Sequence, residues 1–211
     1  AETPCTPGCW APPPGRQVAF HQLLIIARQT WLIDALSGAL GKVDAQLVKK
    51  EMITHAPGDA LKILAAAGIR DEHVFPVPIV LKECPTLVGY YRLLLGSPQK
   101  TFYGSGTGMG RLKSMESAGT ITKKQEALLP AFCDTMSDAL ADLVRQISPR
   151  VTRRDVGELP LLTLGQQFQG ANNNKIGKQA TKEVFLSIAE IVSKYQVSRT
   201  DTQVTIKNAS K

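Results

Sequence analysis

The sequence predicts a mainly α fold with a β-strand near its C-terminal end. Apolar residues recur at every third or fourth position through most of the chain, which is the pattern of amphipathic helices. Alternation with a period of two appears only near the C-terminus, in Thr202, Val204 and Ile206. The chain has 211 residues, of which 43% are hydrophobic and 20% are charged, so it is long enough to bury one sizeable core.

The N-terminal third is expected to hold an extended lead-in and three helices. Residues 1–16 contain five prolines, which sustain neither a helix nor a central strand. The spacing of apolar residues then predicts helices at Gln17–Ala39, Ala45–Thr54 and Ala60–Ala67. Asp44 and Asp59 precede the second and third helices, where an aspartate often caps the N-terminus. Gly68 follows the third helix, and a glycine often ends a helix.

The middle of the chain is expected to hold shorter helices separated by prolines and glycines. Thr86 and Ser97 are the expected caps of helices at Leu87–Leu95 and at residues 98–103. Alternate glycines at positions 104, 106, 108 and 110 predict a flexible loop that leads into a helix around Leu112–Ser117. Thr122–Ile147 is the longest expected helix, since its apolar residues follow one face.

The C-terminal part is expected to change from helix to strand. After Pro149 we expect a short helix ending at Leu164, a loop at residues 170–174 and a helix at Lys175–Lys194. The strand at residues 202–206 appears single in the sequence. Because a single strand is not stable alone, we expect its partners in sequence beyond Lys211. The expected boundaries are therefore a helical domain at 17–199 and the start of a second domain at 200–211.

Two groups of basic and amide residues favour a polyanionic partner such as nucleic acid. The formal net charge is +7. The first group has a single acidic residue, Glu116, among the basic residues Arg92, Lys100, Arg111, Lys113, Lys123 and Lys124. The second stands at the expected start of a helix, where phosphate binds well, and comprises Asn172, Asn173, Asn174, Lys175, Lys178 and Lys182. The alternative for each group is an ordinary solvated face.

Several other chemistries lack a signature in this sequence. The glycine-rich stretch GSGTGMGR has no Gly-Lys-Ser/Thr at phosphate-loop spacing, and no G-x-S-x-G occurs. His21, His55 and His73 stand on separate segments, and the four cysteines form no Cys-x-x-Cys pair. No run of about 18 apolar residues predicts a membrane span. These features together predict a cytoplasmic protein in a reducing compartment, without a zinc site or disulfide framework.

Four blocks of the sequence carry a resemblance to a known family. They are FHQLLIIAR from Phe20, VFPVPIVLKECPTLVGYYRLLLGSPQKTFY from Val74, RLKSMES from Arg111 and LLTLGQQFQGANNNKIGK from Leu161. In this order they resemble the XcyI-type family of type II restriction endonucleases, over residues 20–208. The resemblance implies site-specific cleavage of double-stranded DNA at a G·C-rich palindrome, with Mg²⁺ and as a homodimer when full length.

The resemblance also implies which part of such an enzyme this chain contains. Nucleases of this kind use an acidic residue followed downstream by Asp or Glu, any residue, then Lys. None of the 18 acidic residues has a lysine two positions later. In the family this segment lies after the position matching Asn208, so we expect the chain to end in the first strand of a missing α/β nuclease core. We therefore expect it to bind DNA without cutting it.

The expected DNA contacts come from the two basic groups and the residues around the glycine loop. Lysine, arginine and glutamine can read base edges, whereas other basic residues hold phosphates. The expected contact residues are Arg92, Gln99, Lys100, Tyr103, Arg111, Lys113, Asn172, Asn173, Lys175 and Lys178. The alternative function is a non-catalytic DNA-binding or helical interaction protein derived from a nuclease.

Overall fold

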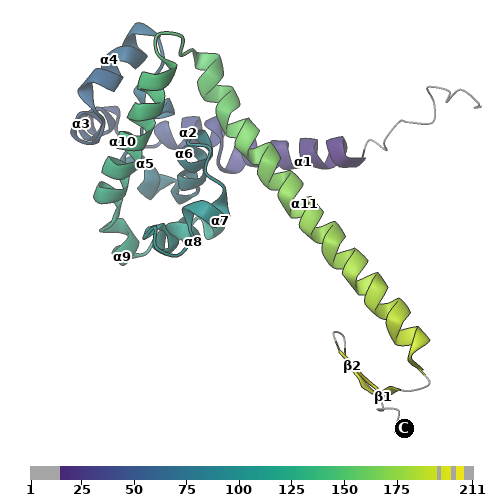
Figure 1. The fold of residues 1–211 in the computed structure, drawn as a ribbon. Helices are drawn as coiled ribbons and strands as arrows, with labels where there is room; N and C mark the ends of the chain where they lie inside the picture. The colour runs from purple at the N-terminus through teal and green to yellow at the C-terminus, as the bar shows by residue number, and fades with distance from the viewer. Residues whose placement is uncertain (1–14, 194–195, 201–202, 207–211) are drawn as a thin grey trace, which may run out of the picture. The chain divides into compact units, whose positions relative to one another are not determined.

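The computed structural model describes residues 15–193, 196–200 and 203–206, and these form a mainly helical fold (Figure 1). The expected lead-in lies outside the described residues, apart from Gly15 and Arg16, which already belong to the first helix. The chain divides into two compact units, Ala1–Gly165 and Gln166–Lys211.

The first unit is built of short helices with bounds that depart in places from the expected ones. Its first half comprises α1 Gly15–Thr30, α2 Ile33–Leu40, α3 Ala45–His55, α4 Gly58–Ala66, the 3₁₀ turn η2 Asp71–His73 and α5 Pro78–Glu83. Its second half comprises η3 Pro85–Leu87, α6 Val88–Leu94, α7 Gln99–Phe102, η4 Met109–Leu112, α8 Lys113–Ala118, α9 Lys123–Glu126 and α10 Leu129–Ile147.

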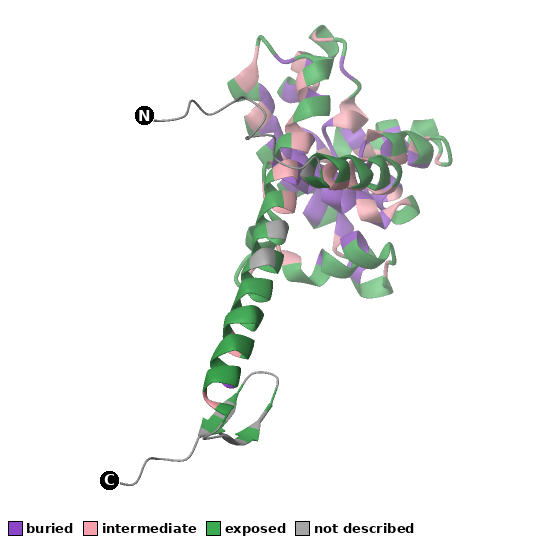
Figure 2. Cartoon of the chain, turned by 90° about the vertical axis from the view of Figure 1, so that its right-hand side faces the viewer, coloured by how far each residue is buried: buried purple, intermediate pink, exposed green. Residues whose placement is uncertain are grey.

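The core of this unit forms around α6, whose seven residues are all buried. One face of α10 supplies buried apolar side chains, including Phe132, Met136 and Leu140, and α10 contacts α3, α4 and α5. Figure 2 shows buried residues gathered inside the unit and exposed residues on its outer surfaces. Burial of each large apolar side chain contributes roughly 1.5–3 kcal/mol.

The expected signals for the ends of α3 and α4 are partly confirmed. Asp44 caps α3, since its carboxylate accepts a hydrogen bond from the Gln46 amide at 2.7 Å. Gly68 ends the α4 region with a positive φ of 65°, which favours glycine. Asp59 is not a cap, because α4 begins at Gly58, and its carboxylate instead accepts hydrogen bonds from Arg145.

The expected caps of α6 and α7 are wrong. The Thr86 hydroxyl donates to the Thr30 carbonyl at 2.6 Å and so ties η3 to the end of α1. The 3₁₀ turn η3 precedes α6, which begins at Val88. Ser97 does not cap α7 either, because Pro98 occupies the cap position. At Thr86 this contact between distant parts of the chain overrides the local preference of the side chain.

Two of the expected long helices are each divided in two. The helix expected at 17–39 breaks between α1 and α2, which lets Leu32 enter the core. The helix expected at 122–147 breaks between α9 and α10. Thr122 forms a capping box with Gln125 at the start of α9, and Pro130 lies in the first turn of α10, where no backbone donor is needed.

In the C-terminal part, two helices were expected, but a single helix, α11, runs without a break over Arg153–Ile191. The loop expected at residues 170–174 is part of this helix. Asparagine and glycine lower helix stability by at most about 1 kcal/mol each. Starting a new helix is more costly than extending an existing one, so the helix continues through this stretch. Residues up to Gly165 belong to the first unit and the remainder to the second.

The second unit also contains a β-hairpin. Strand β1, Gln196–Arg199, pairs antiparallel with β2, Val204–Ile206, with Gln196 opposite Ile206 and Arg199 opposite Val204. The expectation that β2 finds its partner only beyond Lys211 is therefore wrong. The sequence of β1, Gln-Val-Ser-Arg, lacks the alternation that marks β2. The boundary expected between residues 199 and 200 falls at the turn of this hairpin.

One segment satisfies a simple test for a membrane span, although none was expected. Residues Gln17–Leu40 are long and apolar enough by length and composition alone. In the structure they are divided between α1 and α2, and Ala27, Leu32 and Leu36 from this segment pack in the core of the first unit.

Candidate nucleic-acid interface

The glycine loop joins α7 to η4 and has a defined backbone. Gly106 and Gly108 have φ values of 93° and 72°, a region that residues with a Cβ rarely adopt. The Thr107 hydroxyl donates to the carbonyls of Phe102 and Gly104, each at 2.9 Å. A Cβ at Gly104 would lie 3.0 Å from the Lys100 carbonyl oxygen. The glycines are therefore required by the path of the loop.

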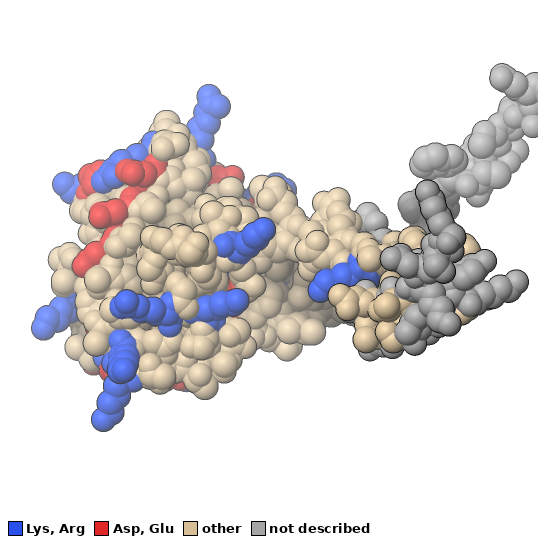
Figure 3. Space-filling model, turned by 60° about the horizontal axis from the view of Figure 1, so that its bottom comes forward, with Lys and Arg blue, Asp and Glu red and all other residues tan. Residues whose placement is uncertain are grey.

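Three of the expected DNA contacts, Lys100, Arg111 and Lys113, stand exposed around this loop. Lys100 lies in α7, Arg111 in η4 and Lys113 at the start of α8. Across the described part of the chain, no side-chain hydrogen bond or ion pair involves these three cations. Figure 3 shows Lys and Arg side chains that project from several places on the first unit, with Asp and Glu beside them in one region. These three side chains are free to bind an anion.

Arg92 lies in the interior instead of on this surface. Its side chain is 2% exposed, and its Nε and Nη2 atoms donate to the Glu116 carboxylate at 2.9 and 2.8 Å. Its Nη1 atom donates to the Ser97 carbonyl. All three guanidinium nitrogens are thus engaged within the protein. In this structure Arg92 does not present its charge to a DNA phosphate, contrary to expectation.

Gln99 and Tyr103 direct their polar atoms to the same carboxylate. The Gln99 amide donates to Glu116 Oε1 and the Tyr103 hydroxyl donates to Oε2, each at 2.6 Å. The Tyr103 ring packs edge-on against Phe102, with ring centroids 5.0 Å apart. Both residues were expected to contact DNA, but here their polar groups support the protein. Sequence reasoning missed Glu116, although it is the one acidic residue in the first basic group.

The electrostatics of Glu116 follow from its surroundings. Burial raises the pKa of the carboxyl, but hydrogen bonds and charge from Arg92, with hydrogen bonds from Tyr103 and Gln99, outweigh it and hold the pKa below its ordinary value. Burial and the adjacent Glu116 charge raise the pKa of Tyr103 well above its ordinary value. At neutral pH Glu116 is therefore charged and Tyr103 is a protonated donor.

A second buried polar side chain, Gln125, holds the other end of the glycine loop. Its amide nitrogen donates to the Arg111 carbonyl and to the Ser114 hydroxyl, each at 2.7 Å. Its amide oxygen accepts from the Thr122 backbone amide at 2.9 Å. The backbone of Arg111 is thereby fixed while its side chain remains exposed.

The second basic group lies in the interior of α11. Asn173, Lys175 and Lys178 are exposed, whereas the side chain of Asn172 lies outside the described residues. Because α11 begins at Arg153, these residues are not at a helix start, and the expected phosphate site at a helix N-terminus is absent there. A shallow hollow of ≈390 Å³ is lined by Asn173, Asn174, Gly177, Lys178 and Thr181.

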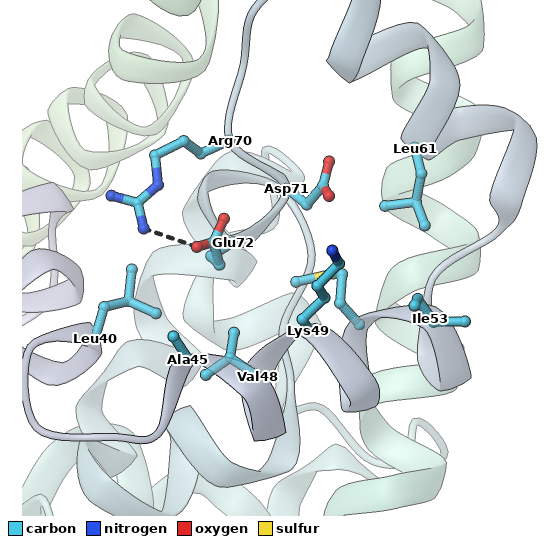
Figure 4. Close-up of a pocket in the computed structure, with 10 residues that line it drawn as sticks. Leu40, Ala45, Val48, Lys49, Ile53, Leu61, Arg70, Asp71 and Glu72 are labelled. Carbon is cyan, nitrogen blue, oxygen red and sulfur yellow. Dashed lines mark hydrogen bonds and ion pairs between the residues drawn. The ribbon is translucent and has the colours of Figure 1, made fainter.

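A separate hollow of ≈340 Å³ lies in the first unit, and none of the expected DNA contacts is among its lining residues (Figure 4). Apolar side chains of α3, together with Leu40 and Leu61, form much of its wall. Arg70 and Glu72 form an ion pair at its edge at 2.8 Å. Burial and the neighbouring Glu72 charge raise the pKa of Asp71, which also lines it. This hollow combines an apolar wall with charges of both signs.

Two histidines and two cysteines have described surroundings. His55 Nδ1 lies 2.6 Å from an Asp134 carboxylate oxygen, and the carbonyl of His73 accepts a hydrogen bond from Tyr90. Cys84 and Cys133 are both free thiols. Among the described residues, no three His, Cys, Asp or Glu side chains gather as a metal-binding group.

Comparison with known proteins gives the family. The XcyI restriction endonuclease family matches residues 21–211. The chain belongs to this family. It is 37% identical over 206 residues to the type II restriction enzyme XcyI of Xanthomonas campestris pv. cyanopsidis, covering 94% of this chain and 61% of that enzyme. It is 36% identical over 185 residues to the type II restriction enzyme Cfr9I of Citrobacter freundii, covering 86% of this chain and 56% of that enzyme.

The family membership confirms the resemblance stated from the four sequence blocks. The chain spans about three fifths of the length of these two XcyI-family relatives. No solved structure shows a significant match to it.

Proposed function

We propose that this chain is the DNA-recognition part of a type II restriction endonuclease that makes site-specific double-strand breaks. The observation that carries the proposal is the set of exposed, unpaired cations Lys100, Arg111 and Lys113 around an ordered glycine loop in an XcyI-family chain. The net charge of +7 adds a general attraction to a polyanion.

The residues divide into two roles. Lys100 and Arg111 stand on the two sides of the glycine loop, and a lysine or arginine that donates to guanine is the commonest specific contact with a base. They read base edges, and this chemistry favours a G·C-rich palindrome. Lys113, Lys175 and Lys178 hold phosphates, and Asn173 adds an amide donor to the backbone.

The remaining parts of the activity belong to the full-length enzyme. A palindromic site has two-fold symmetry, which a homodimer matches. The longer XcyI-family relatives leave room for an α/β nuclease core in the length that this chain does not match. We place Mg²⁺ in that core, because the acidic and lysine-containing motif of such nucleases supplies the metal ligands, and no acidic residue of this chain is followed two positions later by lysine. We place the enzyme in the cytoplasm.

The dependence of duplex binding on salt tests this function. Log affinity falls linearly with log salt concentration, and each lost phosphate contact reduces the magnitude of this slope by about 0.9. The double variant Lys113→Ala with Lys178→Ala removes two proposed phosphate contacts and should therefore lower the slope by about 2, measured by fluorescence anisotropy with a labelled duplex.

A matched control removes two exposed lysines from α3 and α4, Lys50 and Lys62, with the same change in net charge. This pair should lower the slope far less. An equal effect of both pairs would show only general attraction to a basic protein. Affinity that does not change with salt would refute the proposed DNA contact.

A further inference from the structure

We propose that Glu116 is a positioning residue for base recognition, which holds the two sides of the glycine loop in one geometry and so places Lys100 and Arg111. This inference rests on the proposed function. It extends that function to a buried residue that does not touch DNA.

The contacts of Glu116 join the three helices α6, α7 and α8. Its carboxylate accepts from Arg92 of α6, from Gln99 at the start of α7 and from Tyr103 at the end of α7, all within 2.9 Å. Lys100 lies between the last two donors in the sequence. Both ends of the short helix that carries Lys100 are thus attached to one fixed point on α8.

The close packing of α6 against α8 also depends on this side chain. A Cβ at Gly89 would lie 3.0 Å from Glu116 Cγ and 3.1 Å from Cδ, so glycine gives the carboxylate its place. The carboxylate is therefore held from the α6 side by Arg92 and by the absence of a side chain at position 89.

The hydrogen bonds from α7 do more than neutralise a buried charge. Arg92 alone already pairs with both carboxylate oxygens. The bonds from Gln99 and Tyr103 add direction to the attachment of α7. Because the loop from Gly104 to Gly110 contains four glycines, its backbone has little intrinsic stiffness. The Thr107 hydrogen bonds fix the path within the loop, and contacts outside the loop hold the elements that carry Lys100 and Arg111.

Gln125 completes the arrangement on the Arg111 side. It binds the Arg111 carbonyl and the Ser114 hydroxyl, and Ser114 lies two residues before Glu116 in α8. Both cations are therefore held in position relative to α8. Lys100 is held through Glu116, and the backbone of Arg111 is held through Gln125. A change at Glu116 should alter the position of Lys100 without removing either cation.

The test compares two tyrosine variants of the full chain that each lose one buried hydroxyl. Tyr103→Phe removes the hydrogen bond to Glu116, whereas Tyr90→Phe removes a 2.6 Å hydrogen bond to the His73 carbonyl. The probes are the duplex most enriched from a randomised pool by the unaltered chain and its single-base variants. The ratio of affinities for these probes measures discrimination, and the thermal midpoint measures stability.

We expect Tyr103→Phe to lower the discrimination ratio about tenfold while affinity for the substituted duplexes changes little. Tyr90→Phe should lower the thermal midpoint without changing the ratio. Glu116→Gln should lower the ratio at least as far, and adding Tyr103→Phe to it should lower the ratio no further.

Three results would overturn the inference. If both tyrosine variants leave the ratio unchanged, Glu116 serves stability alone. If Tyr103→Phe and Glu116→Gln act additively, Tyr103 acts independently of the carboxylate. If the unaltered chain enriches no sequence, the proposed base reading fails, and this inference fails with it. The first two results leave the proposed function intact, so the failures are distinguishable.

Discussion

Arg92 and Glu116 form a buried ion pair, and each charge depends on the other. Removing one member of such a pair leaves a buried charge without a partner, which costs roughly 3–5 kcal/mol. Glu116→Gln should therefore lower the free energy of unfolding at pH 7 by about that amount, measured by urea denaturation. The matched control is Glu83→Gln, which breaks the exposed pair with Lys42 and should cost less than about 1 kcal/mol.

The pH dependence of this effect follows from the lowered pKa of Glu116. A carboxyl with a lower pKa in the folded state than in the unfolded state contributes stability above its unfolded pKa, about 4.3. That contribution is lost as the pH falls through the folded-state pKa. The difference between the unaltered chain and Glu116→Gln should be largest at neutral pH and shrink below about pH 4. A difference that stays constant with pH would show that Glu116 is not the titrating group.

The residue type alone does not show that Arg92 is buried while the neighbouring cations are exposed. The sequence places Arg92 in an apolar helix with an acidic residue 24 positions later, and nothing local joins the two. Lys100, Arg111 and Lys113, which were predicted to contact DNA, are exposed. Which side chains reach DNA is still a prediction. The buried partner of Arg92 is set by tertiary packing, which periodicity does not encode.

Among the elements, α11 differs most from its expected form. The sequence suggested a loop at residues 170–174, but the structure has a helix through them. Gly170 has open space around its Cα, so an alanine there would meet no other atom. Gly170→Ala should stabilise a helix by about 0.5–1 kcal/mol, whereas Gly170→Pro should destabilise it by about 3 kcal/mol. Amide hydrogen exchange across residues 166–180 measures both changes.

A different response to the two Gly170 variants would indicate a loop at residues 170–174 instead of a helix. In a flexible loop, Gly170→Pro would be tolerated and Gly170→Ala would leave exchange unchanged. A third variant, Gly68→Ala, provides a control for backbone geometry, because Gly68 also has open space but a φ of 65°. It should destabilise the first unit, since an alanine is strained in that conformation.

Local chemistry predicts some of these elements better than others. The Asp44 cap and the Gly68 end were found because each rests on one residue with a strong preference. The division of the long helices depends on where Leu32 can be buried and where Pro130 can start a new helix. The hairpin was missed because β1 has no apolar alternation and is specified by pairing with β2.

At the scale of the whole molecule, the family and the interface lead to a clear expectation about catalysis. Metal-dependent cleavage of DNA needs carboxylates that hold the ion and a cation that stabilises the developing charge. No acidic residue of this chain is followed two positions later by lysine. We therefore expect the purified 211-residue chain to bind duplex DNA without linearising a plasmid in the presence of Mg²⁺. The measurement is agarose electrophoresis over a range of enzyme concentrations, with binding of a labelled duplex by the same preparation as the control for folding. A linear product that disappears on adding EDTA would contradict the expectation and would place a complete nuclease site within these residues.

Binding without cleavage would agree both with the recognition part of a nuclease and with a non-catalytic DNA-binding protein of the same family. Addition of the segment that the longer relatives contain would separate these two, because only the first should then gain cleavage at the sequence that the chain already selects.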